Sequence, residues 1–354
     1  MQHNCRLANH YLVLTVFCLI LQFGKARGEG AGLLFLCSAN FNAFPHFSWV
    51  PLAFSLFYSA PGKTGPSWKL RCIFLEPNAS TVLSFNLSSV VPKPGSEYFL
   101  TIIGRLNRNM PLLNKKHVVA WEQFTLPIDR PSIKTDISNF SDIRLVETDT
   151  TVNVLGDNFQ ITFNKKTGFL NDYVFSKRHI IQSELIPHFW RAPTDNDRGN
   201  MMHIRTAIWK DIGKELNVKF FQRSLSKNVA KIKMVANHDP TGSVITIKYN
   251  IFGNGLIDIE QEIVIEKESL QELPRFGMKM TLPKDFNKVS WYGRGPHESY
   301  WDRKTSAPVK VYSGTVWEQT YPYVRPQETG NKTCLLYTSP SPRDRQKCRM
   351  PGCG

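Results

Sequence analysis

The chain has 354 residues, of which 42% are hydrophobic and 21% are charged, a composition typical of globular proteins and not of disordered ones. Its 44 lysines and arginines against 29 acidic residues give a formal net charge of +15, so a nucleic-acid partner has to be considered. No apolar stretch approaches the roughly 20 residues of a membrane-spanning helix, which excludes a polytopic membrane protein.

The first segment, residues 1–68, is compatible with two interpretations. Residues 11–23 form an apolar run that follows Arg6, as in a secretory signal that is cleaved after Ala26. Residues 32–58 are rich in phenylalanine and show neither the helical nor the strand period, which fits translated non-coding sequence equally well. We therefore expect 1–68 to be an atypical segment that is either a signal or non-native.

The next segment, residues 69–128, contains about four short runs with strand character. Three of them are Val82–Leu87, Tyr98–Leu106 and His117–Leu126. A few short strands over this length predict a small immunoglobulin-like β-sandwich. Residues 129–147 are poor in apolar side chains and open with Asp-Arg-Pro, so we expect a linker there.

The largest segment, residues 148–333, has the pattern of an antiparallel sheet. Val244–Ile251 and Leu256–Ile265 alternate apolar and polar residues around a Gly-Asn-Gly turn, which predicts a long hairpin with one solvated face. Alternation also predicts two further strands. Their apolar residues are Phe159, Ile161 and Phe163 in one, and Phe276, Met278, Met280 and Leu282 in the other.

One stretch has the helical period and predicts a single helix over residues 204–216. Asn200 stands before it in the place of a capping residue. The residues that recur every fourth position are Ile204, Ile208, Ile212 and Leu216. The regular exchange of strands and helices that marks a β/α barrel is absent from the sequence, so the predicted fold class is all-β.

The last segment, residues 334–354, begins with the letters CLLYTSPSPRD, which resemble the translation of a sequencing-library adapter. We expect an adapter-derived tail. Without the two ends, residues 69–333 carry one of the seven cysteines, Cys72, and a net charge of +9. Their basic residues are scattered and form no helix-turn-helix, zinc-finger or RNA-binding motif, so we expect no nucleic-acid partner and no membrane partner.

Three sequence blocks follow one another in the second half of the chain. They are WRAPTDNDRG at 190–199, GRGPHESYWDR at 293–303 and PYVRPQETG at 322–330. With VAWEQF at 119–124, they resemble the C-terminal part of the large β-galactosidases of glycoside hydrolase family 2. The resemblance covers about residues 69–333, and Ser299 and Thr329 stand where that family usually has asparagine.

The resemblance implies an immunoglobulin-like β-sandwich followed by a large galactose-mutarotase-like β-supersandwich, here truncated. Retaining glycosidases need two carboxyl groups about 5–5.5 Å apart, and this family takes both from glutamates of a TIM barrel that would precede residue 69. The chain would then be the C-terminal part of an enzyme that hydrolyses terminal β-D-galactosides such as lactose. It would hold no catalytic residue and would be inactive alone.

The resemblance also implies partners and cofactors of the complete enzyme. Its substrates would be galactosides, its partner the missing barrel domains or chain, and its assembly an oligomer. The Mg and Na ions of the family would bind through the barrel, so we expect no cofactor and no metal ligand here. The family is usually cytoplasmic, whereas residues 1–26 have some features of a secretory signal.

The candidate site residues lie in the loops of the family blocks, where short polar side chains accept backbone N–H bonds and hold turns. We expect them to be structural, and they are Trp190, Arg191, Asp195, Asn196, Asp197, Arg294, Glu298, Tyr300, Asp302 and Arg303. One alternative makes Asp195 and Asp197 an acid/base pair, and another gives that role to His297 and Glu298 in a mutarotase-like reaction.

A last alternative is a non-catalytic galactose-binding module, in which exposed aromatic rings stack on sugar faces. Its candidate residues are Trp190, Trp291, Trp301 and Trp317. Large aromatic side chains also fill the cores of β-sandwiches, so the sequence leaves the role of these tryptophans open.

Overall fold

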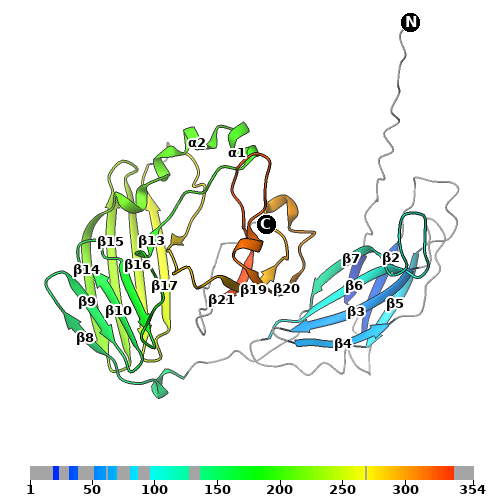
Figure 1. Ribbon diagram of the computed structural model, residues 1–354, viewed down its shortest axis with the longest axis horizontal. Coiled ribbons are helices and arrows are strands. Elements are labelled where there is room, and N and C mark those ends of the chain that lie inside the picture. The colour runs from blue at the N-terminus through cyan, green and yellow to red at the C-terminus, as the bar shows by residue number, and fades with distance from the viewer. Residues whose placement is uncertain are drawn as a thin grey trace, which may run out of the picture. The chain divides into compact units, whose positions relative to one another are not determined.

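The computed structural model describes residues 96–126, 136–267 and 269–338, and the backbone of five earlier strands. The chain divides into two compact units, 1–133 and 134–354, which are described separately (Figure 1). Much of the signal-like run, most of the residues between the units and the tail after 338 lie outside the described residues. No helix within the described part is long and apolar enough to cross a membrane.

The first unit consists of two antiparallel sheets. One has the order β1-β2-β5 and the other the order β4-β3-β6-β7. Their strands are β1 (Leu19–Phe23), β2 (Gly32–Ser38), β3 (Leu52–Ala60), β4 (Lys63–Lys69), β5 (Ser80–Asn86), β6 (Phe99–Leu106) and β7 (Val118–Thr125). The last three confirm the strands expected between residues 82 and 126.

Strands on the N-terminal side of residue 69 take part in this unit. Strand β3 pairs with β6 from Leu52↔Leu106 to Ser59↔Phe99. No strand is expected at 32–58, because apolar and polar residues do not alternate there. Apolar runs without alternation also form strands, which explains why β3 forms against that expectation. That the sandwich begins at residue 69 stays a prediction.

The second unit is a β-sandwich of a five-stranded and a four-stranded antiparallel sheet (Figure 1). The first sheet, in the order β12-β11-β10-β9-β8, contains β8 (Arg144–Glu147), β9 (Thr151–Leu155), β10 (Phe159–Asn164), β11 (Leu170–Phe175) and β12 (Arg178–His179). The second has the order β14-β15-β16-β17, with β14 (Asn217–Ser226), β15 (Val229–His238), β16 (Ser243–Phe252) and β17 (Ile257–Ile265).

The core lies between the inner faces of these two sheets, and the period-two pattern of the sequence builds it. Ile245, Ile247, Tyr249 and Ile251 of β16 are fully buried, while the residues between them are half-buried. From β10, the residues that enter the same core are Phe159, Ile161 and Phe163. The predicted hairpin, the predicted strand at 159–163 and the all-β class are therefore confirmed.

The expected helix over 204–216 is wrong. After the short helix α1 (Asp195–Gly199), the segment holds only the end of α2 (Met202–Arg205) and two three-residue turns, η2 (Ala207–Trp209) and η3 (Ile212–Lys214). Contacts with distant residues break it: a Cβ on Gly213 would lie 2.1 Å from the Pro187 carbonyl oxygen. Trp209 and Ile212 are buried, whereas Ile204 is 59% exposed, so the fourfold spacing does not mark one face.

The strand expected between Phe276 and Leu282 is also largely wrong. Only β18 (Met278–Lys279) forms there, paired with β13 (Ile186–Pro187). Phe276 and Met280 remain 45% and 41% exposed, whereas Met278 and Leu282 pack against the core, so the four apolar residues do not share one buried face.

A three-stranded sheet completes the second unit. Strand β19 (Lys288–Arg294) lies between β20 (Val309–Thr315) and β21 (Cys334–Thr338). Strand β21 falls in the segment that we expect to be an adapter-derived tail, and it pairs with β19 from Gly293↔Cys334 to Ser290↔Thr338. The origin of that segment stays a prediction.

Candidate functional site

The helical turn α1 forms the second half of the first family block, and its own sequence sets its start. The Thr194 hydroxyl accepts the Asp197 backbone N–H at 3.2 Å, and the Asp197 carboxylate accepts the Thr194 backbone N–H at 2.9 Å. This reciprocal capping box satisfies two N–H groups that a helix start leaves free. One oxygen of Asp197 is therefore committed to the backbone.

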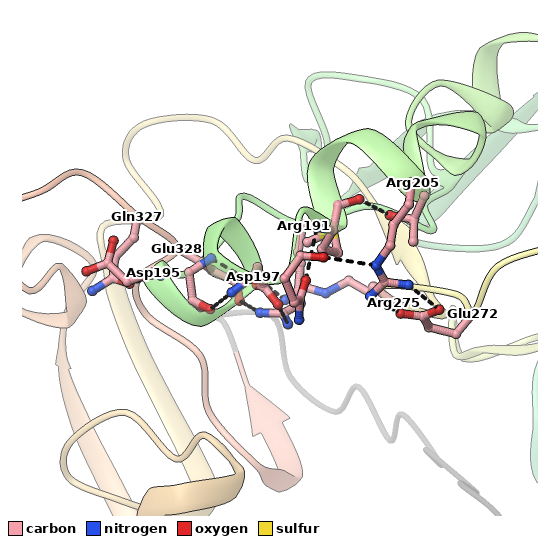
Figure 2. Close-up of polar contacts among 12 residues, drawn as sticks. Arg191, Asp195, Asp197, Arg205, Glu272, Arg275, Gln327 and Glu328 are labelled. Atoms are coloured by element: carbon pink, nitrogen blue, oxygen red, sulfur yellow. Dashed lines mark hydrogen bonds and ion pairs between the residues drawn. The ribbon is translucent and has the colours of Figure 1, made fainter.

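The other oxygen of Asp197 joins an ion network that crosses three loops, which we call the arginine–carboxylate network: Arg191, Asp197, Arg275 and Glu328 (Figure 2). Arg191 donates to Asp197 at 2.8 Å and to Glu328 at 3.4 Å, and Arg275 donates to Glu328 at 2.5 Å. Asp197 and Glu328 are 7% and 8% exposed. Buried carboxylates need such charge-assisted partners.

Weaker contacts fasten the same loops on either side of the network. The Asp195 backbone N–H donates to the Gln327 side chain at 3.0 Å, and Arg198 donates to the Pro326 carbonyl at 2.8 Å. Arg325 lies 3.8 Å from the exposed Asp195 carboxylate. Asp195 and Asp197 therefore contact different partners, and the alternative that makes them an acid/base pair stays untested.

A further contact lies at the far end of the network (Figure 2). Arg205 of α2 is paired with Glu272, and the hydrogen bond from Arg205 lowers the pKa of Glu272 below its usual value. The buried Trp209 indole donates to the Gln271 carbonyl at 3.0 Å. The broken helical segment is thus anchored to the loop that follows β17.

Glu298, from the second block, is the centre of another buried network. Its carboxylate accepts the Tyr323 hydroxyl and, at 2.5 Å, the Gly330 backbone N–H. Arg303 lies 3.6 Å from it and donates to the Tyr323 oxygen at 2.9 Å. Burial and the bond to Glu298 raise the pKa of Tyr323, and burial with the charges of Glu328 and Glu298 raises that of Tyr300.

The other residues of the second block hold their own loop. Arg294 donates to the carbonyls of Lys304 and Ala307 at 2.8 and 3.1 Å. The His297 ring lies 2.6 Å from the Glu298 backbone carbonyl and not against its carboxylate. The mutarotase alternative, which makes His297 and Glu298 an acid/base pair, stays untested. Asp302 is exposed at the surface.

The two departures from the family pattern also have contacts in this structure. Thr329 accepts the Tyr321 backbone N–H through its hydroxyl at 2.8 Å. The Ser299 hydroxyl bonds Thr333, accepting its backbone N–H at 2.6 Å. Hydroxyl groups thus make hydrogen bonds at both positions where the family usually has asparagine.

The candidate tryptophans separate into two kinds. Trp291 is buried, donates to the Arg294 carbonyl at 3.0 Å and stacks on Tyr312, and Trp190 is half-buried. Trp301 and Trp317 are 77% and 83% exposed. Only the last two present a ring to solvent.

The structure brings together Arg191 and Asp197 of the first block, and it adds residues that sequence reasoning missed. Glu328 and Gln327 lie inside the third block, so their position in the sequence could have marked them as candidate site residues. Arg275 belongs to no block, so only the fold reveals it. The structural assignment of the block residues stays a prediction.

The described residues contain no group of three His, Cys, Asp or Glu side chains placed to hold a metal ion. The buried carboxylates are bound by arginines, a tyrosine hydroxyl or backbone N–H groups. These carboxylates are therefore already paired with protein groups, and the placement of the family's Mg and Na ions elsewhere stays an expectation.

Comparison with known proteins places both units. A family model described as β-galactosidase small chain matches residues 155–339, and one described as β-galactosidase domain 4 matches residues 40–127. The β-galactosidase of Priestia megaterium is 35% identical over 247 residues, which are 69% of this chain and 23% of that protein.

Two more β-galactosidases show the same partial coverage. That of Halalkalibacterium halodurans is 26% identical over 83% of this chain and 29% of its own length. That of Vibrio cholerae is 30% identical over 70% of this chain and 25% of its own length. The chain thus spans about a quarter of the curated relatives that it matches, and it belongs to the β-galactosidase small-chain family.

Proposed function

We propose that this chain is a non-catalytic, C-terminal part of a β-galactosidase that hydrolyses terminal β-D-galactosides such as lactose. The observation that carries the proposal is the family match over residues 155–339, together with relatives named β-galactosidase that extend far beyond the matched stretch. In the complete enzyme, the arginine–carboxylate network would keep three loops of the small-chain sandwich in a fixed shape.

The chemistry of the buried carboxylates supports a non-catalytic role. A retaining glycosidase needs one carboxyl group free to attack the sugar and a second free to exchange a proton. Asp197 and Glu328 are bound by Arg191 and Arg275, and Glu298 is bound by Tyr323 and Gly330. These acids are already used to fasten loops, so the catalytic pair would come from another part of the enzyme.

The same proposal includes the partners of the chain. The catalytic barrel, on the same or another polypeptide, would bind the galactoside and the Mg and Na ions, and the complete protein would be an oligomer. The chain itself would need neither a cofactor nor a nucleic-acid or membrane partner.

The test is hydrolysis of a chromogenic β-galactoside by the purified chain. We expect no turnover above that of a mock preparation from a host strain without β-galactosidase. Turnover that co-purifies with the chain and persists in such a strain would contradict the proposal.

The second candidate function, a galactose-binding module, is favoured by one observation, the exposure of Trp301 and Trp317. It predicts a saturable change in tryptophan fluorescence when galactose or lactose is added. No change up to about 100 mM would mean binding weaker than a millimolar ligand's roughly −4 kcal/mol, and would exclude this function.

A further inference from the structure

Lys332 lies just before β21, and its amine contacts two neutral groups. The Nζ donates to the Pro296 carbonyl at 2.7 Å and lies 5.0 Å from the centre of the Trp291 ring. The Trp291 side chain is buried, whereas Lys332 is half-buried and its bond to Pro296 is exposed to solvent. The amine is therefore held in place and remains open to a small molecule.

The surroundings of this amine contrast with those of lysines that form ion pairs. Lys165, Lys214 and Lys248 lie 3.1, 2.9 and 3.0 Å from carboxylate oxygens. The Lys332 nitrogen forms no ion pair with any residue that the structure describes, and its partners are the carbonyl and the ring. A partly buried ammonium without a carboxylate beside it loses hydration that no opposite charge replaces.

Burial makes the Lys332 amine easier to deprotonate. It lowers the pKa of Lys332 below its usual 10.5, and it outweighs the opposite influence of the negative charges of Glu298 and Cys334. At a given pH, a larger fraction of Lys332 is therefore the neutral amine than for a lysine in water. The neutral nitrogen carries the lone pair that attacks an electrophile, and proteins activate lysines by this kind of desolvation.

The backbone on both sides of Lys332 is fixed by hydrogen bonds. The Gly330 N–H donates to the Glu298 carboxylate at 2.5 Å, and the Thr333 N–H donates to the Ser299 hydroxyl at 2.6 Å. The segment therefore keeps the amine in its half-buried place, and this environment depends on the fold and not on the neighbouring sequence.

We propose that Lys332 is the preferred acylation site among the described lysines, and that it takes a small acyl group from an acyl phosphate or an acyl thioester. The Nζ lone pair forms a bond to the acyl carbon, while the bond from that carbon to the phosphate oxygen or the thiol sulfur breaks. The leaving group takes the electron pair, and the nitrogen loses one proton to water. The product is a neutral amide whose N–H can still donate to the Pro296 carbonyl. This site is independent of the proposed function.

The test exposes the full chain to acetyl phosphate near neutral pH and, in a second arm, to an acetyl thioester. Peptide mapping by mass spectrometry then gives the acetylation rate of each lysine within the same sample. The matched control is Lys310, an exposed lysine of β20 that lies opposite Gly293 in the same three-stranded sheet. A parallel sample in concentrated urea gives the rates without the fold.

We expect Lys332 to react at least about fivefold faster than Lys310 in the folded chain, and within about twofold of it in urea. A preference with one donor alone would support the proposal and identify that donor as the source. Equal or slower reaction of Lys332 with both donors would overturn the proposal, as would faster reaction of another described lysine. The same preference in urea would also overturn it, because the neighbouring sequence and not burial would then set the rate.

The pH dependence of the Lys332 rate tests the physical cause. The rate rises with pH and levels off once the amine is neutral, so the lowered pKa of Lys332 predicts a plateau that begins at a lower pH in the folded chain than in urea. Coincident profiles would overturn the proposal, because the folded chain would then make Lys332 no more reactive than a lysine in water.

Discussion

Glu328 is the carboxylate that Arg191 and Arg275 share, and Glu328→Gln removes its charge while nearly preserving its size. Its two oxygens lie 3.4 Å from Arg191 and 2.5 Å from Arg275. The Glu328 side chain is 9% exposed, whereas those of Arg191 and Arg275 are 24% and 38% exposed. The substitution therefore leaves two arginines facing a neutral amide.

The expected magnitude lies between two limits. Removal of one partner from a fully buried ion pair costs about 3–5 kcal/mol, and an exposed pair contributes about 0–1 kcal/mol. Because water reaches both arginines, we expect a loss of about 2–3 kcal/mol in the free energy of unfolding of the second unit. For a unit of this size, that corresponds to a melting temperature lower by about 4–12 °C.

Differential scanning calorimetry of the full chain measures this loss in the transition of the second unit. The control is Glu260→Gln, since Glu260 is 64% exposed and pairs with Lys248 at 3.0 Å across the four-stranded sheet. We expect the control to melt within about 2 °C of the unmodified chain. An equally small effect of Glu328→Gln would refute the reasoning that the arginine–carboxylate network holds the loops.

Three further substitutions test other parts of the second unit. Tyr323→Phe leaves the buried Glu298 carboxylate without one donor and should cost about 1–3 kcal/mol in urea unfolding; an unchanged midpoint would contradict this. Ile247→Ala empties a fully buried position and should cost about 2–5 kcal/mol in the same assay, so a loss below about 1 kcal/mol would contradict a closely packed core. Hydrogen bonds from Arg223 and Lys165 lower the pKa of Glu147 below 4.5, so its contribution is present above that pH and lost as the pH falls through the lowered value. Glu147→Gln should flatten the acid-side fall in melting temperature, and identical pH profiles would contradict the assignment.

The strands of the sandwich are predictable wherever one sheet face is buried and the other is solvated. Alternation then follows directly from burial, as at Ile245, Ile247 and Ile251 of β16, which are fully buried. The apolar alternation from Phe276 to Leu282 meets no sheet face, and only a two-residue strand forms there. Alternation of apolar and polar residues therefore identifies a strand only where another sheet covers one face of that strand.

The helical segment shows why local pattern fails where distant contacts decide. Four isoleucine and leucine residues have helical spacing, but Gly213 packs directly against the Pro187 carbonyl, and only the three-residue turn η3 forms there. Propensity is a weak influence that tertiary contacts override. The same holds for the network: Asp197 is visible in its sequence block, whereas Arg275 becomes a partner only through the fold.

The most direct test of the central claim is β-galactoside hydrolysis by the purified chain, alone and with the preceding part of the Priestia megaterium enzyme. Each component is also assayed separately with a chromogenic substrate. The account predicts no turnover by the chain alone and turnover in the mixture that exceeds the sum of the separate components. Turnover by the chain alone would contradict its non-catalytic role, and a mixture no more active than its components would contradict its place in the enzyme.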